Sequence, residues 1–388
     1  MKQVQVAIIG GGVSGLYAAS LLENIGVDYV LLEGRTQAGG RIQSLHPVHG
    51  DAHLTFNADD VKQRVDLGAT WVWPEFQTAL AALLCELNIA IIPQAEQGDM
   101  LLERAAHLPV SRHPGYVSAP PSMRIVGGMR VLVEKLQQRL NPASLWFDHR
   151  VTHLDALDDA ITLRGTAKNN ESFSLTAQHI FLALPPALAA GLAFTPALPA
   201  ALSREWLHSS TWMAAHAKYV AIYAQSFWRE QNLSGEARSA AGPMAEIHDA
   251  SVPEGVSALF GFMGIPAQTR WTTTESNLKA MCRAQLVRLF GAQAANPIAE
   301  FFKDWASDDL TATPADLSAN VGHVVPAAVV SEGMWQGYLQ GIAAEWSPTF
   351  PGYVAGAVEA AEQGILAFIA RQSIAFARSE INEKQEPK

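Results

Sequence analysis

The chain has 388 residues, of which 49% are hydrophobic and 16% are charged. This composition excludes an intrinsically disordered chain and supplies enough apolar side chains for two domains of ordinary size. The formal charge of −10 at pH 7 argues against nucleic acid or an anionic membrane as a partner, and it is compatible with cationic substrates.

Cysteine usage and hydropathy narrow the class further. Cys85 and Cys282 are the only cysteines, too few for a disulfide framework or a metal cluster, and we expect both to be buried free thiols in helices. No run of 18 uncharged apolar residues occurs, and the first strand begins by Val4, which leaves no room for a secretory signal. We therefore expect a cytoplasmic protein without a metal site.

The first 33 residues have the order strand, glycine turn, helix, strand and acid. The apolar run Val4–Ile9 precedes Gly10-Gly11-Gly12-Val13-Ser14-Gly15. A helix is expected over Leu16–Gly26, and a second strand over Asp28–Glu33. This order predicts a site for a dinucleotide.

Each glycine of the turn has a physical reason. Gly10 permits a tight turn, Gly12 lets the backbone approach a pyrophosphate, and Gly15 lets the helix pack closely on the sheet. The N–H groups at the helix start, with Ser14 among them, would face the phosphates, and Glu33 would accept hydrogen bonds from ribose hydroxyls.

A second glycine turn follows the acid. The chain reads Glu33-Gly34-Arg35-Thr36-Gln37-Ala38-Gly39-Gly40-Arg41, which would add backbone N–H groups and a fixed cation beside the same pyrophosphate. The stretch resembles the E-x-x-x-x-x-G-G-R element of flavoproteins of the amine oxidase superfamily. The resemblance favours FAD over NAD, with Gly34, Arg35, Gly40 and Arg41 among the cofactor-binding residues.

The elements that follow fill out two domains. We expect a helix over Phe76–Leu87, strands over Ile89–Pro93 and Asp99–Glu103, a loop over His107–Ser122 and a helix after Gly128. Strand-like runs at residues 145–147, 149–157, 161–164, 172–175 and 180–184 predict an antiparallel insertion that returns to a parallel sheet.

The sequence changes in character after Trp206. Strands are expected over Lys218–Tyr223, Ala258–Met263 and Tyr338–Ala343, with a helix over Glu275–Phe290 and another starting near Gly352. The predicted fold is α/β: a Rossmann-type FAD-binding domain of residues 1–73, 123–205 and 335–388, and a discontinuous α+β substrate-binding domain of residues 74–122 and 206–334.

Asp66-Leu67-Gly68-Ala69-Thr70-Trp71 resembles the D-x-G-(G/A)-x-(W/Y) element of flavin amine oxidases. Gly68, Ala69 and Thr70 are candidate cofactor-binding residues: the small Gly68 and Ala69 would let backbone N–H groups reach the flavin ring, and Trp71 would pack near its edge. A hairpin turn with a core tryptophan is the alternative. Two looser matches are Gly127-Gly128-Met129 and Val151, whose counterpart contacts adenine in relatives; helix capping or core packing would explain either one alone.

Lys218 is the residue that we expect to carry chemistry. It begins a mostly apolar strand that is followed by Phe227-Trp228, similar to the K-x-x-x-x-Y strand and F-W pair of monoamine and polyamine oxidases. The resemblance implies a lysine that holds a water at flavin N5 and stabilises negative charge on reduced flavin and dioxygen. The alternative is a solvated strand lysine.

The stretch from Glu345 to Ala357 looks like the closing segment of the family, in which an acid precedes G-Y-x-x-G-A. Glu345 matches the acid near the ribityl chain, and Gly352, Tyr353 and Val354 would lie at a helix N-terminus suited to the N1/O2 edge of reduced flavin. Tyr353 also matches one side of an aromatic cage that guides an amine; a core tyrosine is the alternative.

Departures from the family pattern leave the substrate open. Ala343 replaces a glycine, and neither cysteine lies near the closing segment, so non-covalent FAD is expected. The second cage aromatic is missing near Trp305, and the cage is either half built or completed by another aromatic residue. The candidates are Trp71, Trp346 and Phe350.

The resemblance implies an FAD-dependent oxidase that moves hydride from the α-carbon of an amine to flavin N5, with dioxygen reduced to hydrogen peroxide and the imine hydrolysed. Lys218, Tyr353 and Trp71 are its candidate catalytic residues. An amino-acid substrate would need an arginine for its carboxylate, and Arg124, Arg229 and Arg270 are equal candidates. The alternatives are a carbon–carbon desaturase of the carotenoid desaturase or protoporphyrinogen oxidase type, or a flavin-binding protein without turnover. The oligomeric state stays open.

Overall fold

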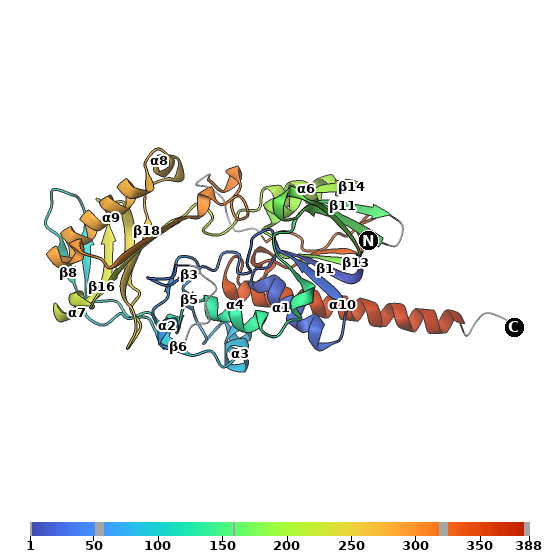
Figure 1. Ribbon diagram of the computed structural model, residues 1–388, viewed down its shortest axis with the longest axis horizontal. Coiled ribbons are helices and arrows are strands. Elements are labelled where there is room, and N and C mark those ends of the chain that lie inside the picture. The colour runs from blue at the N-terminus through green and yellow to red at the C-terminus, as the bar shows by residue number, and fades with distance from the viewer. Residues whose placement is uncertain (1, 51–57, 158–159, 318–324, 384–388) are drawn as a thin grey trace. The chain divides into compact units, whose positions relative to one another are not determined.

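The computed structural model describes residues 2–50, 58–157, 160–317 and 325–383, and the chain forms two compact units (Figure 1). Unit 1 comprises Met1–Ala38, Leu136–Trp212 and Val321–Lys388, and unit 2 comprises Gly39–Lys135 and Met213–Asn320. These packing boundaries place residues 39–73 and 123–135 in unit 2. Which ranges serve the cofactor and which serve the substrate stays a prediction.

Unit 1 is built on a mixed sheet whose parallel part contains the glycine turn. Strands β10, β2, β1, β13 and β20 pair in parallel, and β13, β12 and β11 pair antiparallel before the short parallel strand β14. Their bounds are β1 Lys2–Ile9, β2 Tyr29–Leu32, β10 Leu145–Trp146, β11 Arg150–Leu157, β12 Ala160–Thr166, β13 Ser172–Leu182, β14 Ala193–Thr195 and β20 Leu339–Gly341. The expected parallel sheet with an antiparallel insertion is confirmed.

Strand β13 corrects one expectation. The two strands expected at residues 172–175 and 180–184 are one continuous strand of 11 residues. The polar residues in its middle stay in the ladder because β1 pairs with it on one side, and β12 and then β20 pair with it on the other. Hydrogen bonding on both edges therefore overrides the break in the apolar pattern.

Two helices cover the parallel strands of unit 1. Helix α1 (Val13–Asn24) begins three residues earlier than expected because Gly12 is its N-cap, and it packs against α10 (Val354–Glu383). Shorter helices are α5 (Pro186–Ala190) and α6 (Ala200–Leu207). The largest fully buried side chains include Ile8, Leu16 and Phe181, which form the core between helices and sheet.

Unit 2 contains a seven-stranded mixed sheet in the order β19-β15-β18-β17-β16-β7-β8. All of its neighbouring strands pair antiparallel except β16 and β7. The bounds are β7 Asp99–Glu103, β8 Ser111–His113, β15 Ala217–Tyr223, β16 Leu233–Ser239, β17 Met244–Asp249, β18 Ser257–Met263 and β19 Ala299–Asp304. Strand β8 lies within the segment that we expected to be a loop.

The two faces of this sheet pack differently. Helix α9 (Glu275–Phe290) runs along one face (Figure 1), where Tyr219, Ala221 and Tyr223 meet its apolar residues. The other residues of β15, Val220 and Ile222, pack on the opposite face with Phe260 of β18. Since alternate residues of a strand share a face, Lys218 lies on this second face.

Unit 2 also contains two small sheets of short strands, and these carry the motif residues Asp66 and Trp71. Strands β5 (Trp71–Val72), β9 (Met123–Ile125) and β6 (Ile91–Pro93) form one small sheet, and β3 (Ser44–Leu45) pairs with β4 (Val65–Asp66). The remaining helices are α2 (Ala58–Val61), α3 (Thr78–Glu86), α4 (Arg130–Gln137), α7 (Phe227–Glu230) and α8 (Ala267–Trp271).

The two cysteines differ in environment. Cys282 is a buried free thiol, as expected, but Cys85 is exposed. Helix α3 directs Leu80, Leu83 and Leu84 inward, which leaves Cys85 on its outer side. The apolar composition of the segment misled the expectation because helical periodicity, and not composition, decides which residues face the core.

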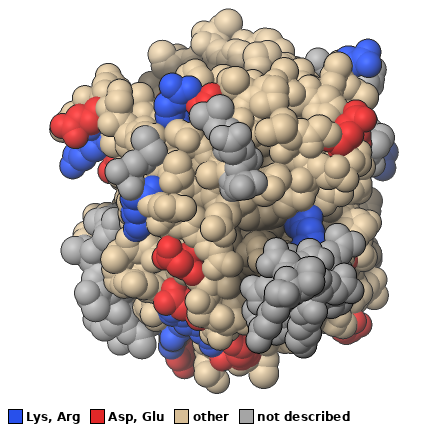
Figure 2. Space-filling view, turned by 90° about the vertical axis from the view of Figure 1, so that its right-hand side faces the viewer, with Lys and Arg blue, Asp and Glu red and all other residues tan. Residues whose placement is uncertain are grey.

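Among the described residues, every helix is too short or too polar to cross a membrane. On the face drawn in Figure 2, acidic and basic side chains are interspersed and most of the visible surface is uncharged.

Candidate active site

In unit 1 the glycine turn is required by the packing of the chain itself at two positions. Gly10 has a φ of +111°, and a Cβ there would lie 2.6 Å from the carbonyl oxygen of Ala183. A Cβ on Gly15 would lie 1.9 Å from the carbonyl oxygen of Gly10. Any side chain at either position would therefore collide with backbone.

Gly12 is different because the protein does not require it. Its φ of −74° and ψ of −176° suit any residue, and it is the N-cap of α1. A Cβ built there meets no atom of the described residues within 4 Å. Open space at the N-terminus of a helix fits the close approach of a pyrophosphate, so the turn fits the dinucleotide that the sequence predicts.

Glu33 is buried at the end of β2, and its carboxylate already accepts two backbone hydrogen bonds. The N–H of Gly11 donates to Oε2 at 2.7 Å, and the N–H of Arg35 donates to Oε1 at 2.8 Å. The guanidinium of Arg35 lies 3.7 Å from Oε1. Each carboxylate oxygen can accept a further hydrogen bond, so these contacts leave acceptor capacity for a ribose while Glu33 holds the backbone at both Gly11 and Arg35.

We expect Glu33→Gln to destabilise the protein even without a cofactor. An amide is uncharged and accepts at only one oxygen, so both N–H groups that meet Glu33 lose a charged acceptor and one of them faces an NH2 donor instead. The free energy of unfolding should fall by about 1–3 kcal/mol, measured by urea unfolding of the apoprotein. A stability equal to that of the parent chain would show that these two contacts carry little weight.

Ser14 is buried, and its hydroxyl donates to the carbonyl of Ile342, just beyond β20. Its side chain therefore connects α1 to the closing segment, and only its backbone N–H remains as the group that we propose for a phosphate. Val151 lies in β11 with its side chain in the core. Any contact of Val151 with adenine would accordingly be made by its backbone. Gly34 lies half-buried beside Arg35.

In the closing segment of unit 1, Tyr353 packs against an aromatic residue from an earlier part of the chain. Tyr353, 39% exposed, stacks on Trp212, 37% exposed, with ring centroids 5.9 Å apart and planes at 26°. Gly352 has a φ of +82°, and a Cβ there would lie 2.3 Å from that of Trp212. Glu345 is buried, and Val354 begins α10. Tyr353 is therefore not a core residue, which removes the alternative reading.

One candidate for the aromatic cage, Trp346, is wrong, and one exposed aromatic residue, Trp212, was not predicted. Trp346 is a core residue that meets Trp206 edge-on at 5.4 Å between ring centroids, so it cannot complete a cage. Trp212 was missed, because it lies outside any helix or strand and 141 positions before its partner (353 − 212). Nothing in the local sequence indicates this pairing.

In unit 2 the arginine turn and the segment expected at the flavin ring pack directly together. Gly40 has a φ of +58° and precedes the half-buried Arg41. A Cβ on Gly68 would lie 2.0 Å from the carbonyl oxygen of Arg41. Ala69 is half-buried and Thr70 is buried. Only glycine fits at position 68, so the two motifs form one substructure.

Lys218 is 2% exposed and lies against this substructure. Its Nζ donates to Oγ1 of Thr70 at 2.5 Å and to the carbonyl of Gly68 at 3.4 Å. The same Nζ lies 4.1 Å from the ring centroid of Phe260 and 5.6 Å from that of Phe262. Lys218 is therefore not the solvated strand lysine of the alternative reading.

Burial weakens the basicity of this amine. Desolvation lowers the pKa of Lys218 from 10.5 to about 7; the nearby Asp66 carboxylate opposes the change, and Arg124 adds to it. Burial also raises the pKa of Asp66, which accepts from the hydroxyl of Ser44 at 2.5 Å and the N–H of Met129 at 2.9 Å. Near neutral pH, a small change in surroundings therefore decides whether Lys218 is charged.

This shift predicts a pH-dependent stability. The pKa of Lys218 is lower in the folded state than its unfolded value of 10.5, so between pH 7 and about 10 the unfolded chain binds more protons and folding gains stability as pH rises. We expect Lys218→Met to be more stable than the parent chain at pH 6. That advantage should shrink by up to about 1.4 kcal/mol per pH unit above pH 7. A pH-independent difference in urea unfolding would refute the shift.

Four rings form an aromatic cluster beside Lys218: Trp71, His248, Phe260 and Phe262. The Trp71 ring centroid lies 5.0 Å from that of His248, 5.5 Å from that of Phe260 and 6.1 Å from that of Phe262. The Trp71 indole donates to Gln94 at 2.8 Å. The two phenylalanines are not among the site residues predicted from the sequence, although the alternation of the expected strand at 258–263 already places both on one face.

Trp305 supports the same region without joining the cluster. It is buried, and its indole donates to the carbonyl of Leu67 at 2.9 Å, beside Gly68. It therefore positions the backbone of the segment that meets Lys218.

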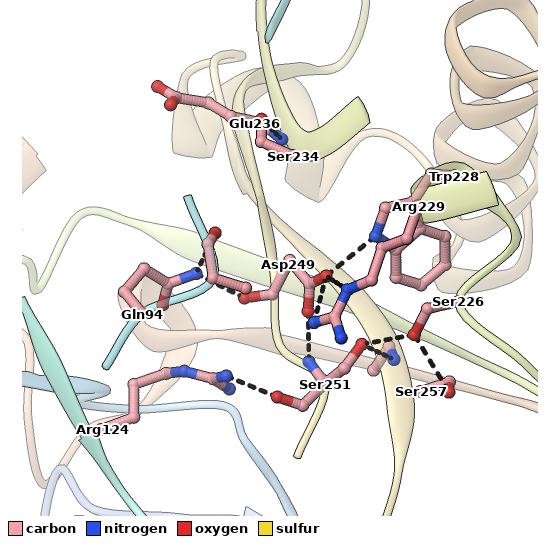
Figure 3. Close-up of polar contacts among 12 residues, drawn as sticks. Gln94, Arg124, Ser226, Trp228, Arg229, Ser234, Glu236, Asp249, Ser251 and Ser257 are labelled. Carbon is pink, nitrogen blue, oxygen red and sulfur yellow. Dashed lines mark hydrogen bonds and ion pairs between the residues drawn. The ribbon is translucent and has the colours of Figure 1, made fainter. Parts of the chain in front are cut away.

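The three candidate arginines have different partners. Arg229 forms an ion pair with the fully buried Asp249 at 2.8 Å, as Figure 3 shows. Arg270 pairs with both carboxylate oxygens of Asp304, at 2.9 and 2.6 Å. Arg124 donates instead to a backbone carbonyl, that of Ser251, at 2.5 Å. Arg229 and Arg270 are thus each paired with a carboxylate, whereas the hydrogen bond of Arg124 goes to a backbone carbonyl.

A dinucleotide turn in unit 1, and a buried lysine against a small-residue segment in unit 2, are features that match known proteins. The model of the family described as flavin containing amine oxidoreductase matches residues 116–363, which is more than half of the chain, and a model of an NAD(P)-binding Rossmann-like domain matches residues 8–87. The chain therefore belongs to the flavin-containing amine oxidoreductase family, whose members are FAD-dependent oxidoreductases.

Individual relatives are distant, and the share of this chain that they cover differs. Amine oxidase B of Sus scrofa is 21% identical over 461 residues, covering 93% of this chain and 85% of the relative. The probable flavin-containing monoamine oxidase A of Dictyostelium discoideum is 25% identical over 236 residues, covering 56% and 50%.

Two solved structures share the fold. Putrescine oxidase with putrescine bound and cyclohexylamine oxidase from Brevibacterium oxydans IH-35A each superpose with a TM-score of 0.77 at 19% identity, covering 95% of this chain and 99% of the other. These similarities confirm the expected fold class, an α/β fold with a Rossmann-like domain and a mixed-sheet second part.

Proposed function

We propose that this protein is an FAD-dependent amine oxidase that uses dioxygen as its electron acceptor. The observation that carries the proposal is the buried amine of Lys218, hydrogen-bonded to Thr70 and directed at the segment that matches the flavin-ring element of the family. A buried cation without a carboxylate bonded to it is costly to keep, and a role beside a reacting centre accounts for it. Amine oxidases among its relatives support the same chemistry.

FAD would be bound without a covalent link. The pyrophosphate would lie at Gly10, Gly12 and the N–H groups at the start of α1, and Glu33 would bind the ribose of the adenosine. In unit 1 the proposed flavin-binding groups are Glu345 and the N-terminus of α10, and in unit 2 they are Gly68 and Ala69. Neither Cys85 nor Cys282 lies in the closing segment, which supports non-covalent binding.

Bound FAD would supply the two-electron oxidation of the carbon beside the substrate nitrogen and pass the electrons to dioxygen. The contribution of the chain is positioning and charge. Lys218 would orient one water through its Nζ hydrogen atoms and, when protonated, favour negative charge nearby. Trp71 is the candidate in unit 2 for holding the amine by its ring face, and Tyr353 is the candidate in unit 1; such ring faces attract positive charge and exclude water.

The test follows the colour of the flavin. The purified protein should be yellow, should bleach when an amine is added under nitrogen, and should recover its colour with release of hydrogen peroxide when air is admitted. Benzylamine, putrescine, cyclohexylamine and a set of amino acids form the first panel. A yellow protein that none of these amines bleaches would refute amine oxidation and favour the desaturase alternative or a flavin protein without turnover.

A further inference from the structure

Arg124 is a buried cation whose hydrogen-bonding capacity is largely unused. It is 5% exposed, and within the described part of the chain its single hydrogen bond goes from Nη2 to the carbonyl of Ser251. Its Nε is buried without any hydrogen-bond partner. Figure 3 shows the guanidinium directed at the Ser251 backbone, while Asp249 is occupied by Arg229, Trp228 and the Ser251 N–H. A buried guanidinium in this state lacks an anion.

The sum of the charges around Arg124 also indicates that an anion is missing. Arg124 and Lys218 interact electrostatically with one another and with three further charged groups. These are the cation Arg229 and the acids Asp66 and Asp249. With Lys218 protonated, three positive and two negative charges leave a sum of +1. One univalent anion would balance this sum, whereas a doubly charged phosphate would reverse it.

Arg124 also lies beside the proposed catalytic residues. Its strand β9 pairs antiparallel with β5, and Arg124 stands directly opposite Trp71. Residues directly opposite in an antiparallel pair project from the same face of a sheet. The Trp71 ring contacts Phe260, over which the Nζ of Lys218 lies. Arg124, Trp71 and Lys218 therefore belong to one contiguous part of unit 2.

We infer that Arg124 binds a carboxylate of the substrate, so that the enzyme oxidises amines that also carry an acid group. The planar guanidinium matches a carboxylate through two parallel N–H donors, and Nε is available for one of them. This inference rests on the proposed amine oxidase function and narrows its substrate class. None of the named substrates of the related structures, putrescine and cyclohexylamine, carries such a group.

The first experiment measures carboxylate binding without turnover. Acetate and benzoate are titrated into the FAD-loaded protein, with benzyl alcohol as the uncharged probe, and binding is followed by the flavin absorption spectrum and by the melting temperature. Arg124→Gln should weaken carboxylate affinity about 10- to 100-fold, and Arg124→Lys should weaken it less because the charge is kept. Arg112→Gln, which removes an exposed arginine of β8, is the matched control and should bind like the parent chain.

The second experiment compares substrates that differ by one carboxylate. Phenylalanine and 2-phenylethylamine share a skeleton, and the ratio of their kcat/KM values should fall about 10- to 100-fold in Arg124→Gln through a higher KM for phenylalanine. Carboxylate affinities that are undetectable, or equal in all variants, would overturn the inference. If amines without a carboxylate then still bleached the flavin, the proposed oxidase function would be supported although the inference about Arg124 had failed. Carboxylate binding that depends on Arg124, without bleaching by any amine, would refute the oxidase function and keep the anion site.

Discussion

Replacing Lys218 by methionine is expected to slow flavin reoxidation by dioxygen about 10²- to 10³-fold while FAD stays bound. The magnitude is that of removing one preorganised electrostatic group from a site that excludes water. Methionine has a similar length and no charge, so it fits between Thr70 and the phenylalanine rings without creating a cavity. The loss should therefore reflect chemistry and not collapse of unit 2.

The measurement separates the two halves of the reaction. Anaerobic reduction by an amine and reoxidation by air are followed at the flavin absorption band, and the ratio of FAD to protein is taken from the same spectra. Lys303→Met is the matched control, because Lys303 stands directly opposite Lys218 on β19 but pairs with Asp308 at 2.9 Å. Equal reduction and reoxidation rates in Lys218→Met and the parent chain would refute the assigned role.

Gly12→Val is expected to lower FAD affinity at least about 100-fold and to leave the apoprotein intact. The backbone angles of Gly12 suit valine, and a Cβ there has no neighbour among the described residues within 4 Å. The side chain would instead occupy the space proposed for the pyrophosphate and keep it from the N–H groups of α1. Excluding a charged ligand from such donors costs several kcal/mol of binding.

Gly15→Val provides the contrast. Its Cβ would meet the carbonyl oxygen of Gly10 at 1.9 Å, so this variant should lose both apoprotein stability and FAD. Apoprotein melting temperatures and FAD titrations by fluorescence quenching distinguish the two. An FAD affinity in Gly12→Val equal to that of the parent chain would show that the cofactor does not approach the backbone at this turn.

Much of this architecture can be predicted from local sequence. The β1–α1–β2 unit follows from apolar runs, a glycine turn and an acid that all lie within 33 residues, and the burial of Lys218 follows from the apolar residues of its strand. In both cases the residues that determine the local structure lie close together in the sequence. The sequence therefore predicted the fold class and the dinucleotide turn well.

The features that escaped prediction depend on tertiary contacts. The stacking of Trp212 on Tyr353 joins segments that no periodicity connects. Three arginines were equal candidates in sequence, and only their carboxylate partners, Asp249 for Arg229 and Asp304 for Arg270, set Arg124 apart. Spacing along the chain carries no information on which acid a given arginine meets.

The hydrogen bond between Ser14 and Ile342 has a consequence for biosynthesis. It joins residues 328 positions apart, and in the same unit β20 completes the sheet beside β13 while α10 packs on α1. The glycine turn is therefore translated well before β20 and α10, and it acquires these neighbours only after residues beyond Val354 have left the ribosome. Cofactor loading should accordingly follow the synthesis of β20 and α10, and a nascent chain stalled before β20 should carry no flavin.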